Sequence, residues 1–187
     1  MSKVVIVSGS PNPGSRLTGI TQYVEQQLAL QKIEVKHITV ASLPAEDLIH
    51  ARFDSPAIIE AAAIVEAAEV VIIASPVYKA SFTGVLKTFL DLLPQKGLQN
   101  KFVTPLFIGG SIAHLLSIDY ALKPVLSALN AKHFGSGVFA VDSQIARIDA
   151  GVGESQFQLN DDLRVRLDAA IAELIEELSH RQQKQYI

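Results

Sequence analysis

The sequence has no cysteine and no tryptophan among its 187 residues. The missing cysteines exclude disulfides, thiolate metal sites and a cysteine nucleophile. No apolar run approaches the roughly 18 to 20 residues of a membrane helix, and the one behind Met1 is too short for a signal peptide. With 16 basic and 19 acidic side chains and no basic cluster, the chain lacks the surface that nucleic-acid binding needs. We therefore expect a cytosolic (cytoplasmic) protein that binds neither membranes nor nucleic acid.

The composition present is that of a globular protein, with 49% hydrophobic and 19% charged residues. A chain of this length can bury a core within one domain, so we expect a single domain over residues 1–187. Apolar runs alternate with segments of helical periodicity from end to end. Strands are expected at 4–7, 33–40, 70–74, 102–108 and 134–141, and helices at 17–28, 57–68, 83–93, 113–131 and 160–178.

This alternation predicts an α/β fold, a doubly wound five-stranded parallel sheet with helices on both faces. The commonest strand order for such a sheet is the flavodoxin-like 2-1-3-4-5. Two features fit less well: Pro105 lies inside the fourth run, and the Gly-, Ser- and Gln-rich residues 142–158 read as an irregular surface excursion. Residues 135–140 have G-x-G-x-x-A spacing but lie in an expected strand with no helix behind them, so we reject a dinucleotide motif.

Ligands of such sheets bind beyond the carboxyl ends of the strands, and this rule selects the loops after the first, third and fourth strands. The first loop, residues 8–16, is rich in Gly, Ser and Pro and leads into a helix, whose N-terminus favours an anion. Arg16 adds a guanidinium that suits phosphate oxygens. An unliganded turn would have a similar composition, but at this position we favour phosphate binding.

The second and third loops suit a flat, polar-edged ring. Residues 75–84 combine backbone amides with Tyr78, which in isolation would more often be a packing residue. Gly109 and Gly110 let the backbone approach a ligand closely, or else form a tight turn. Together the loops predict a pocket for a phosphorylated, flat ligand. The five histidines lack metal-ligand spacing; His114 is of interest because it follows the glycines.

The chain resembles the NAD(P)H-dependent FMN reductases of the flavodoxin-like superfamily, and most of all the NADPH-dependent reductase of two-component alkanesulfonate monooxygenase systems. The likeness extends over nearly the whole chain to residues 142–144 and is looser beyond. The matching stretches are Gly9-Ser10-Pro11 with Ser15-Arg16, ARFDSPA at 51–57, PVYKA at 76–80, Gly84 with residues 86–88, residues 90–94, and residues 109–129 with GG at their start and AHLL and DYALKPVLSAL within.

This resemblance implies an oxidoreductase that transfers a hydride from NADPH to FMN, with positioning and not an acid–base pair as its catalytic device. It implies a homodimer or homotetramer that supplies reduced FMN to an alkanesulfonate monooxygenase. Many relatives have an arginine where this chain has Asn12. The implied phosphate contacts are Ser10, Asn12, Ser15, Arg16, Leu17 and Thr18; the implied ring contacts are Pro76, Val77, Tyr78, Lys79, Gly109, Gly110 and Ser111, with His114 as a further candidate.

Pro124 lies inside the expected helix 113–131 and has no N–H, so the carbonyl of Tyr120 loses its helical partner. A π-bulge near Tyr120 would accommodate this; a plain proline kink with a packed tyrosine is the alternative. The related sulfonate-system reductases have a tyrosine insertion that forms a π-helix at a subunit interface, and Tyr120 matches it. The resemblance therefore implies a role for Tyr120 in flavin release and in the oligomer.

Two other functions are compatible with the same fold. One is a flavodoxin-type electron carrier, although such carriers are usually more acidic than this chain with its net charge of −3. The other is an enzyme that reduces quinones, azo dyes or chromate through bound FMN. The sequence alone does not distinguish NADPH from NADH.

Overall fold

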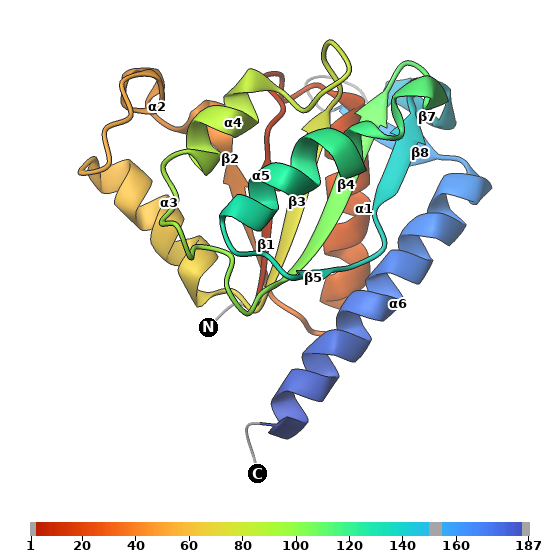
Figure 1. Ribbon diagram of the computed structural model, residues 1–187. Helices are drawn as coiled ribbons and strands as arrows, with labels where there is room; N and C mark the ends of the chain where they lie inside the picture. Colours follow the sequence, from red (N-terminus) through yellow and green to blue (C-terminus); the bar gives the residue numbers. More distant parts are fainter. Residues whose placement is uncertain (1–2, 150–154, 185–187) are drawn as a thin grey trace.

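The computed structural model describes residues 3–149 and 155–184, and a parallel sheet forms its centre (Figure 1). The strand order is β2-β1-β3-β4-β5, with β6 also paired to β4, which confirms the flavodoxin-like order that the sequence predicts. The strands are β1 Val4–Ser8, β2 Val35–Thr39, β3 Val70–Pro76, β4 Phe102–Gly109, β5 His133–Phe134 and β6 Val138–Val141.

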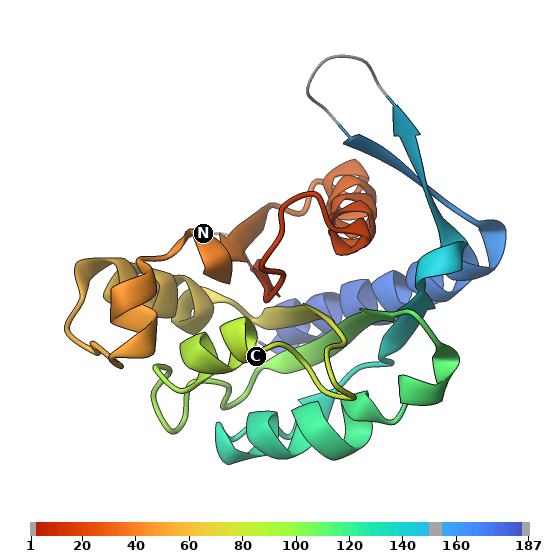
Figure 2. The same ribbon diagram turned by 90° about the horizontal axis from the view of Figure 1, so that it is seen from above.

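Helices cover both faces of the sheet (Figure 2). α1 (Arg16–Leu30) and α6 (Asp161–Lys184) lie on one face, and α3 (Pro56–Ala67), α4 (Gly84–Leu90) and α5 (Lys123–Ala128) on the other. Because successive strand residues point to opposite faces, β1 is buried along its whole length: Val4 and Ile6 join the first layer, Val5 and Val7 the second. Two short helices after β2 were not predicted from the sequence, η1 (Val40–Ser42) and α2 (Ala45–Ile49).

The fifth strand is interrupted, which corrects the single strand expected at 134–141. β5 pairs with Phe102 and Val103 of β4, and β6 pairs with Leu106–Gly109, so the break falls opposite Thr104 and Pro105. Proline has no N–H for a sheet hydrogen bond. Pro105 is therefore tolerated inside the sheet where its neighbour on one side is broken.

The expectation that residues 142–158 form an irregular segment is also wrong. It contains a 3₁₀ turn, η4 (Asp142–Gln144), and an antiparallel hairpin of β7 (Ile145–Asp149) and β8 (Ser155–Leu159). The hairpin packs over α1, where a Cβ on Gly19 would lie only 2.5 Å from Cβ of Phe157. Contact with a distant helix, not local propensity, decides that this polar segment forms strands.

The long helix expected at 113–131 is broken into pieces. A 3₁₀ turn, η2 (Ile112–His114), and a π-helix, η3 (Ile118–Leu122), precede α5. The amide of Lys123 donates to the carbonyl of Ile118, the i→i−5 bond of a π-helix, which confirms the π-bulge prediction. Tyr120 is 79% exposed, so the alternative with a packed tyrosine is wrong.

In residues 3–149 and 155–184 no helix combines the length and apolarity needed to cross a membrane. The same ranges hold no group of three or more histidine or carboxylate side chains that could bind a metal ion.

Candidate functional site

The three loops selected from the sequence meet at the carboxyl ends of β1, β3 and β4. The amide of Gly9 donates to the carbonyl of Ala74 at 2.8 Å, and that of Val77 donates to the carbonyl of Ile108 at 2.7 Å. The strand order reverses between β1 and β3, and this is where flavodoxin-like folds place their ligand.

A threonine that the sequence analysis did not single out connects the first loop to the second. Thr83 donates its hydroxyl proton to the carbonyl of Gly9 at 2.6 Å, and its amide donates to Oγ of Ser75 at 3.1 Å. Both side chains are buried. Thr83 begins the expected helix, where a hydroxyl is a recognisable cap, but its contact with Gly9 spans 74 residues and has no local signal.

The first loop is shaped by its own side chains. Oγ of Ser10 donates to the carbonyl of Asn12 at 2.8 Å, and Oδ1 of Asn12 accepts from the amide of Gly14 at 2.9 Å. Ser15 caps α1 by accepting from the amide of Leu17 at 3.2 Å, and Thr18 donates to the carbonyl of Pro13 at 2.8 Å. Asn12 therefore closes a turn within this loop.

Arg16 and Leu17 begin α1 in different environments. The side chain of Leu17 is completely buried in the core, so only its backbone faces the loop. Arg16 is half-buried, and its Nε donates to the carbonyl of Ile145 on the hairpin at 2.9 Å. Its two terminal nitrogens donate to no atom that the structure describes, so the guanidinium keeps donors for an oxyanion.

The second loop projects a tight turn from the end of β3. Pro76 is buried and Val77 half-buried, whereas Tyr78 and Lys79 are exposed. Tyr78 and Ser81 exchange backbone hydrogen bonds of 2.9 and 3.2 Å around Lys79 and Ala80. Both of these residues have positive φ, 51° and 64°, which is costly for residues with a side chain.

The third loop approaches the second along bare backbone. A Cβ on Gly109 would lie 3.0 Å from Cζ of Phe139 and 3.5 Å from Cβ of Val77, so there is little room for a side chain here. Gly110, Ser111 and His114 are exposed, and Oγ of Ser111 accepts from the amide of Ala113 at 3.2 Å. This sequence-predicted set therefore lies beside the second loop.

A cavity of about 320 Å³ joins the second loop to the π-helix region. Ala80 lines it from the strained turn, and His114, Ser117 and Tyr120 line it from the other side. The hydroxyl of Ser117 is buried and has no partner among the described residues. This cavity brings Tyr120 and His114 to the same place as the second loop.

Groups with displaced pKa lie away from the three loops. Burial lowers the pKa of Lys101, whose ammonium donates to the carbonyls of Glu66 and Ala68. Burial and the bond to Asp168 raise the pKa of Tyr23 to about 12. These pKa shifts therefore belong to residues outside the three loops.

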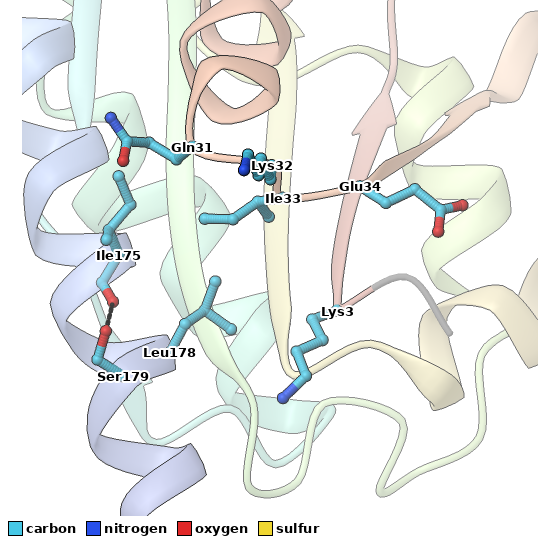
Figure 3. A pocket seen from close by; sticks show the side chains of 8 residues that line it. All are labelled: Lys3, Gln31, Lys32, Ile33, Glu34, Ile175, Leu178 and Ser179. Carbon is cyan, nitrogen blue, oxygen red and sulfur yellow. Dashed lines mark hydrogen bonds between the residues drawn. The ribbon is translucent and has the colours of Figure 1, made fainter.

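A second cavity, of about 470 Å³, lies near the amino ends of the strands, opposite the three loops (Figure 3). It is lined by Lys3 at the start of β1, by the turn that leads into β2, and by Ile175, Leu178 and Ser179 of α6. Since Lys3 precedes the amino end of β1, this cavity is separate from the loops at the carboxyl ends.

Comparison with known proteins finds similarity to FMN reductases. A family model described as NADPH-dependent FMN reductase matches residues 2–146. An Escherichia coli K12 protein named FMN reductase (NADPH) is 44% identical over 179 residues, which cover 96% of this chain and 91% of the relative. A protein of the same name from Pseudomonas putida KT2440 is 47% identical over 164 residues, 88% of this chain and 82% of the relative.

A solved structure, the apo form of an NADH:FMN oxidoreductase called EMOB, superposes with a TM-score of 0.80. It is 33% identical to this chain, and the match covers 92% of this chain and 88% of that one. This match covers a larger share of the chain than residues 2–146 do.

Proposed function

The chain belongs to the NADPH-dependent FMN reductase family, and from this premise we propose that it delivers reduced FMN to a partner monooxygenase. It is an oxidoreductase that uses FMN and NADPH. The observation that supports an FMN site in this chain is the joining of three loops at the point where strand order reverses, through the bonds of Gly9, Thr83 and Val77.

The loops fit the two chemically different ends of FMN. We assign the phosphate to the first loop, where α1 begins and Arg16 keeps free donors. We assign the isoalloxazine ring to the second and third loops, where Gly109 leaves the backbone bare and Val77 approaches it. The residues proposed to hold the phosphate are Ser10, Asn12, Ser15, Arg16, Leu17 and Thr18; those proposed for the ring are Pro76, Val77, Tyr78, Lys79, Gly109, Gly110, Ser111 and His114.

Bound FMN supplies the chemistry, because its ring accepts the hydride of the nicotinamide. The chain's own contribution is positioning. Ser75 and Thr83 hold the second loop against the first, and their buried hydroxyls leave it little freedom to shift. Holding two flat rings in register removes much of the entropic part of the barrier.

The decisive experiment is NADPH oxidation by the purified protein with and without added FMN. We expect oxidation that depends on added FMN, with sequential kinetics, and faster turnover with NADPH than with NADH. Ping-pong turnover with retained flavin would instead indicate reduction of a quinone, azo dye or chromate. A yellow protein that does not oxidise NADPH would indicate an electron carrier.

For the partner we propose an FMNH₂-dependent alkanesulfonate monooxygenase, with cytosolic sulfur scavenging as the setting. The support is the similarity of residues 109–129 to the sulfonate-system reductases and the π-helix within them. The test is sulfite release from octanesulfonate by such a monooxygenase, with this protein, NADPH and FMN as the reductant source. Absence of sulfite despite active FMN reduction would remove this partner and leave the reductase activity standing.

We also propose that the π-helix face mediates self-association as a dimer or tetramer. Four large apolar side chains are exposed along this segment, namely Ile112, Leu115, Leu116 and Tyr120. An exposed apolar patch of this kind is typical of a protein contact. Sedimentation of the purified protein as a monomer at micromolar concentration would contradict it.

Replacing Tyr120 with Ala should increase the FMN that co-purifies with the protein. The reason is that Tyr120 lines the cavity beside the second loop, and its family counterpart is associated with flavin that passes through as a substrate. The measurement is flavin absorbance per protein after purification. The control is Ile59→Ala, a 54% exposed apolar residue of α3, and equal flavin content in both variants and the wild type would contradict the role of Tyr120.

A further inference from the structure

The hairpin carries an exposed arginine next to its packed residues. Ile145 and Leu159 pair across the hairpin and are both buried, and two residues farther along Arg147 pairs with Phe157. Alternate residues of a strand share a face, so Arg147 lies on the side turned toward α1, where Phe157 covers Gly19. Its own side chain is exposed, and it extends to the first loop.

Arg147 and Arg16 connect the hairpin and the first loop in both directions. Nη2 of Arg147 donates to the carbonyl of Gly14 at 2.6 Å. Nε of Arg16 donates to the carbonyl of Ile145 at 2.9 Å. The two arginines therefore bracket Ser15, the residue that caps α1.

Both partners of these arginines are neutral carbonyl groups, so neither positive charge is compensated by its hydrogen bond. Neither guanidinium forms an ion pair with a side chain that the structure describes. Two uncompensated charges thus flank the start of α1, whose dipole has the same sign. Such a cluster is favourable when an anion joins it.

We propose that Arg147 is a second specificity-determining cation of the phosphate loop, which favours FMN over flavins that lack a phosphate. This rests on the proposed function. Arg147 keeps the loop in place through Gly14, and its charge attracts the phosphate dianion. The sequence analysis missed it because it lies in the segment expected to be irregular.

The test uses Arg147→Met and Arg147→Lys in the full-length protein. Dissociation constants for FMN and for riboflavin are measured by quenching of flavin fluorescence at low and high salt. We expect Arg147→Met to weaken FMN about two- to fivefold at low salt, the range of an exposed charge interaction, with riboflavin unchanged. Arg147→Lys should keep most of the preference for FMN, and high salt should reduce the difference between wild type and Arg147→Met.

The matched control is Arg181→Met at the far end of α6. Arg181 also donates to a backbone carbonyl, that of Asn100, and in addition pairs with Glu177, so the variant removes a positive charge and a carbonyl bond far from the first loop. It should leave both flavins unaffected. If Arg147→Met weakened the binding of FMN and riboflavin equally, Arg147 would only hold the loop in place, and the inference would be overturned. No change in the binding of either flavin would overturn it as well. A wild-type protein that binds no FMN would overturn the proposed function as well.

Discussion

Gly9 is the point at which the first loop contacts α4, and a methyl group there should separate the two. A Cβ on Gly9 would lie 2.5 Å from Cβ of Leu86 and 3.2 Å from its Cα. Leu86 is completely buried and its Cα belongs to the helix backbone, so neither atom can move aside cheaply. The same Cβ would lie 3.1 Å from Oγ1 of Thr83, whose bond to the carbonyl of Gly9 joins the first two loops.

The cost of Gly9→Ala can be estimated from these contacts. Overpacking of a tight core costs about 1–3 kcal/mol. Loss of the buried bond between Thr83 and Gly9 adds about 1–3 kcal/mol, because its groups are left unpaired. The sum of about 2–6 kcal/mol is a large part of the stability of an ordinary domain. In a chain of this size it corresponds to a fall in Tm of about 4–24 °C.

The assay is thermal unfolding followed by circular dichroism, together with FMN binding by fluorescence quenching. Gly9→Ala should lower Tm and weaken FMN, since the loop moves as the helix is displaced. Gly84→Ala is the matched control, because a Cβ at Gly84, the first residue of α4, would meet nothing within 4 Å. It should change Tm by no more than about 2 °C. If Gly9→Ala melts with the wild type and binds FMN equally well, the contact has been misjudged.

Two further predictions concern the framework. Thr104→Val should raise the free energy of unfolding by about 1 kcal/mol, because Oγ1 of Thr104 is buried without a partner in the described structure; urea unfolding checks this, and lower stability would contradict it. The pKa of Tyr23 is raised to about 12, so its bond to Asp168 stabilises the fold fully below pH 10 and loses this effect as pH rises toward 12. The stability difference between wild type and Tyr23→Phe should therefore shrink over that interval, and a constant difference would refute the assignment.

The parts of the fold that the sequence predicts well are those with a local cause. β1, β3 and β4 are continuous apolar runs because both of their faces are buried, and such runs are visible in a sequence. A disturbed helix near Tyr120 was predictable because Pro124 lacks an N–H whatever its surroundings, whereas the choice of a π-bulge over a kink came from the resemblance. The loops of the site follow from strand order, since the rule for their position depends only on topology.

The parts that the sequence does not predict depend on contacts between distant residues. The break in the fifth strand lies opposite Thr104 and Pro105 of the neighbouring strand, and the glycines at 135 and 137 do not by themselves show how the two pieces pair. The hairpin depends on Gly19, which is 138 residues before Phe157 and makes room for its ring. The link between Thr83 and Gly9 spans 74 residues. In each case the structural role of a residue depends on another residue that is far away in the sequence.

The strained turn of the second loop lies next to both the proposed flavin site and the π-helix proposed for subunit contact. Lys79 and Ala80 hold positive φ values that an Asn-Gly pair would adopt without strain. Backbone strain in side-chain-bearing residues concentrates where structure serves a ligand, and here Ala80 lines the same cavity as Tyr120. A flavin against the second loop and a protein partner on the π-helix would therefore act on one turn. The turn at Lys79 and Ala80 thus borders both the proposed ring site and the cavity lined by the π-helix.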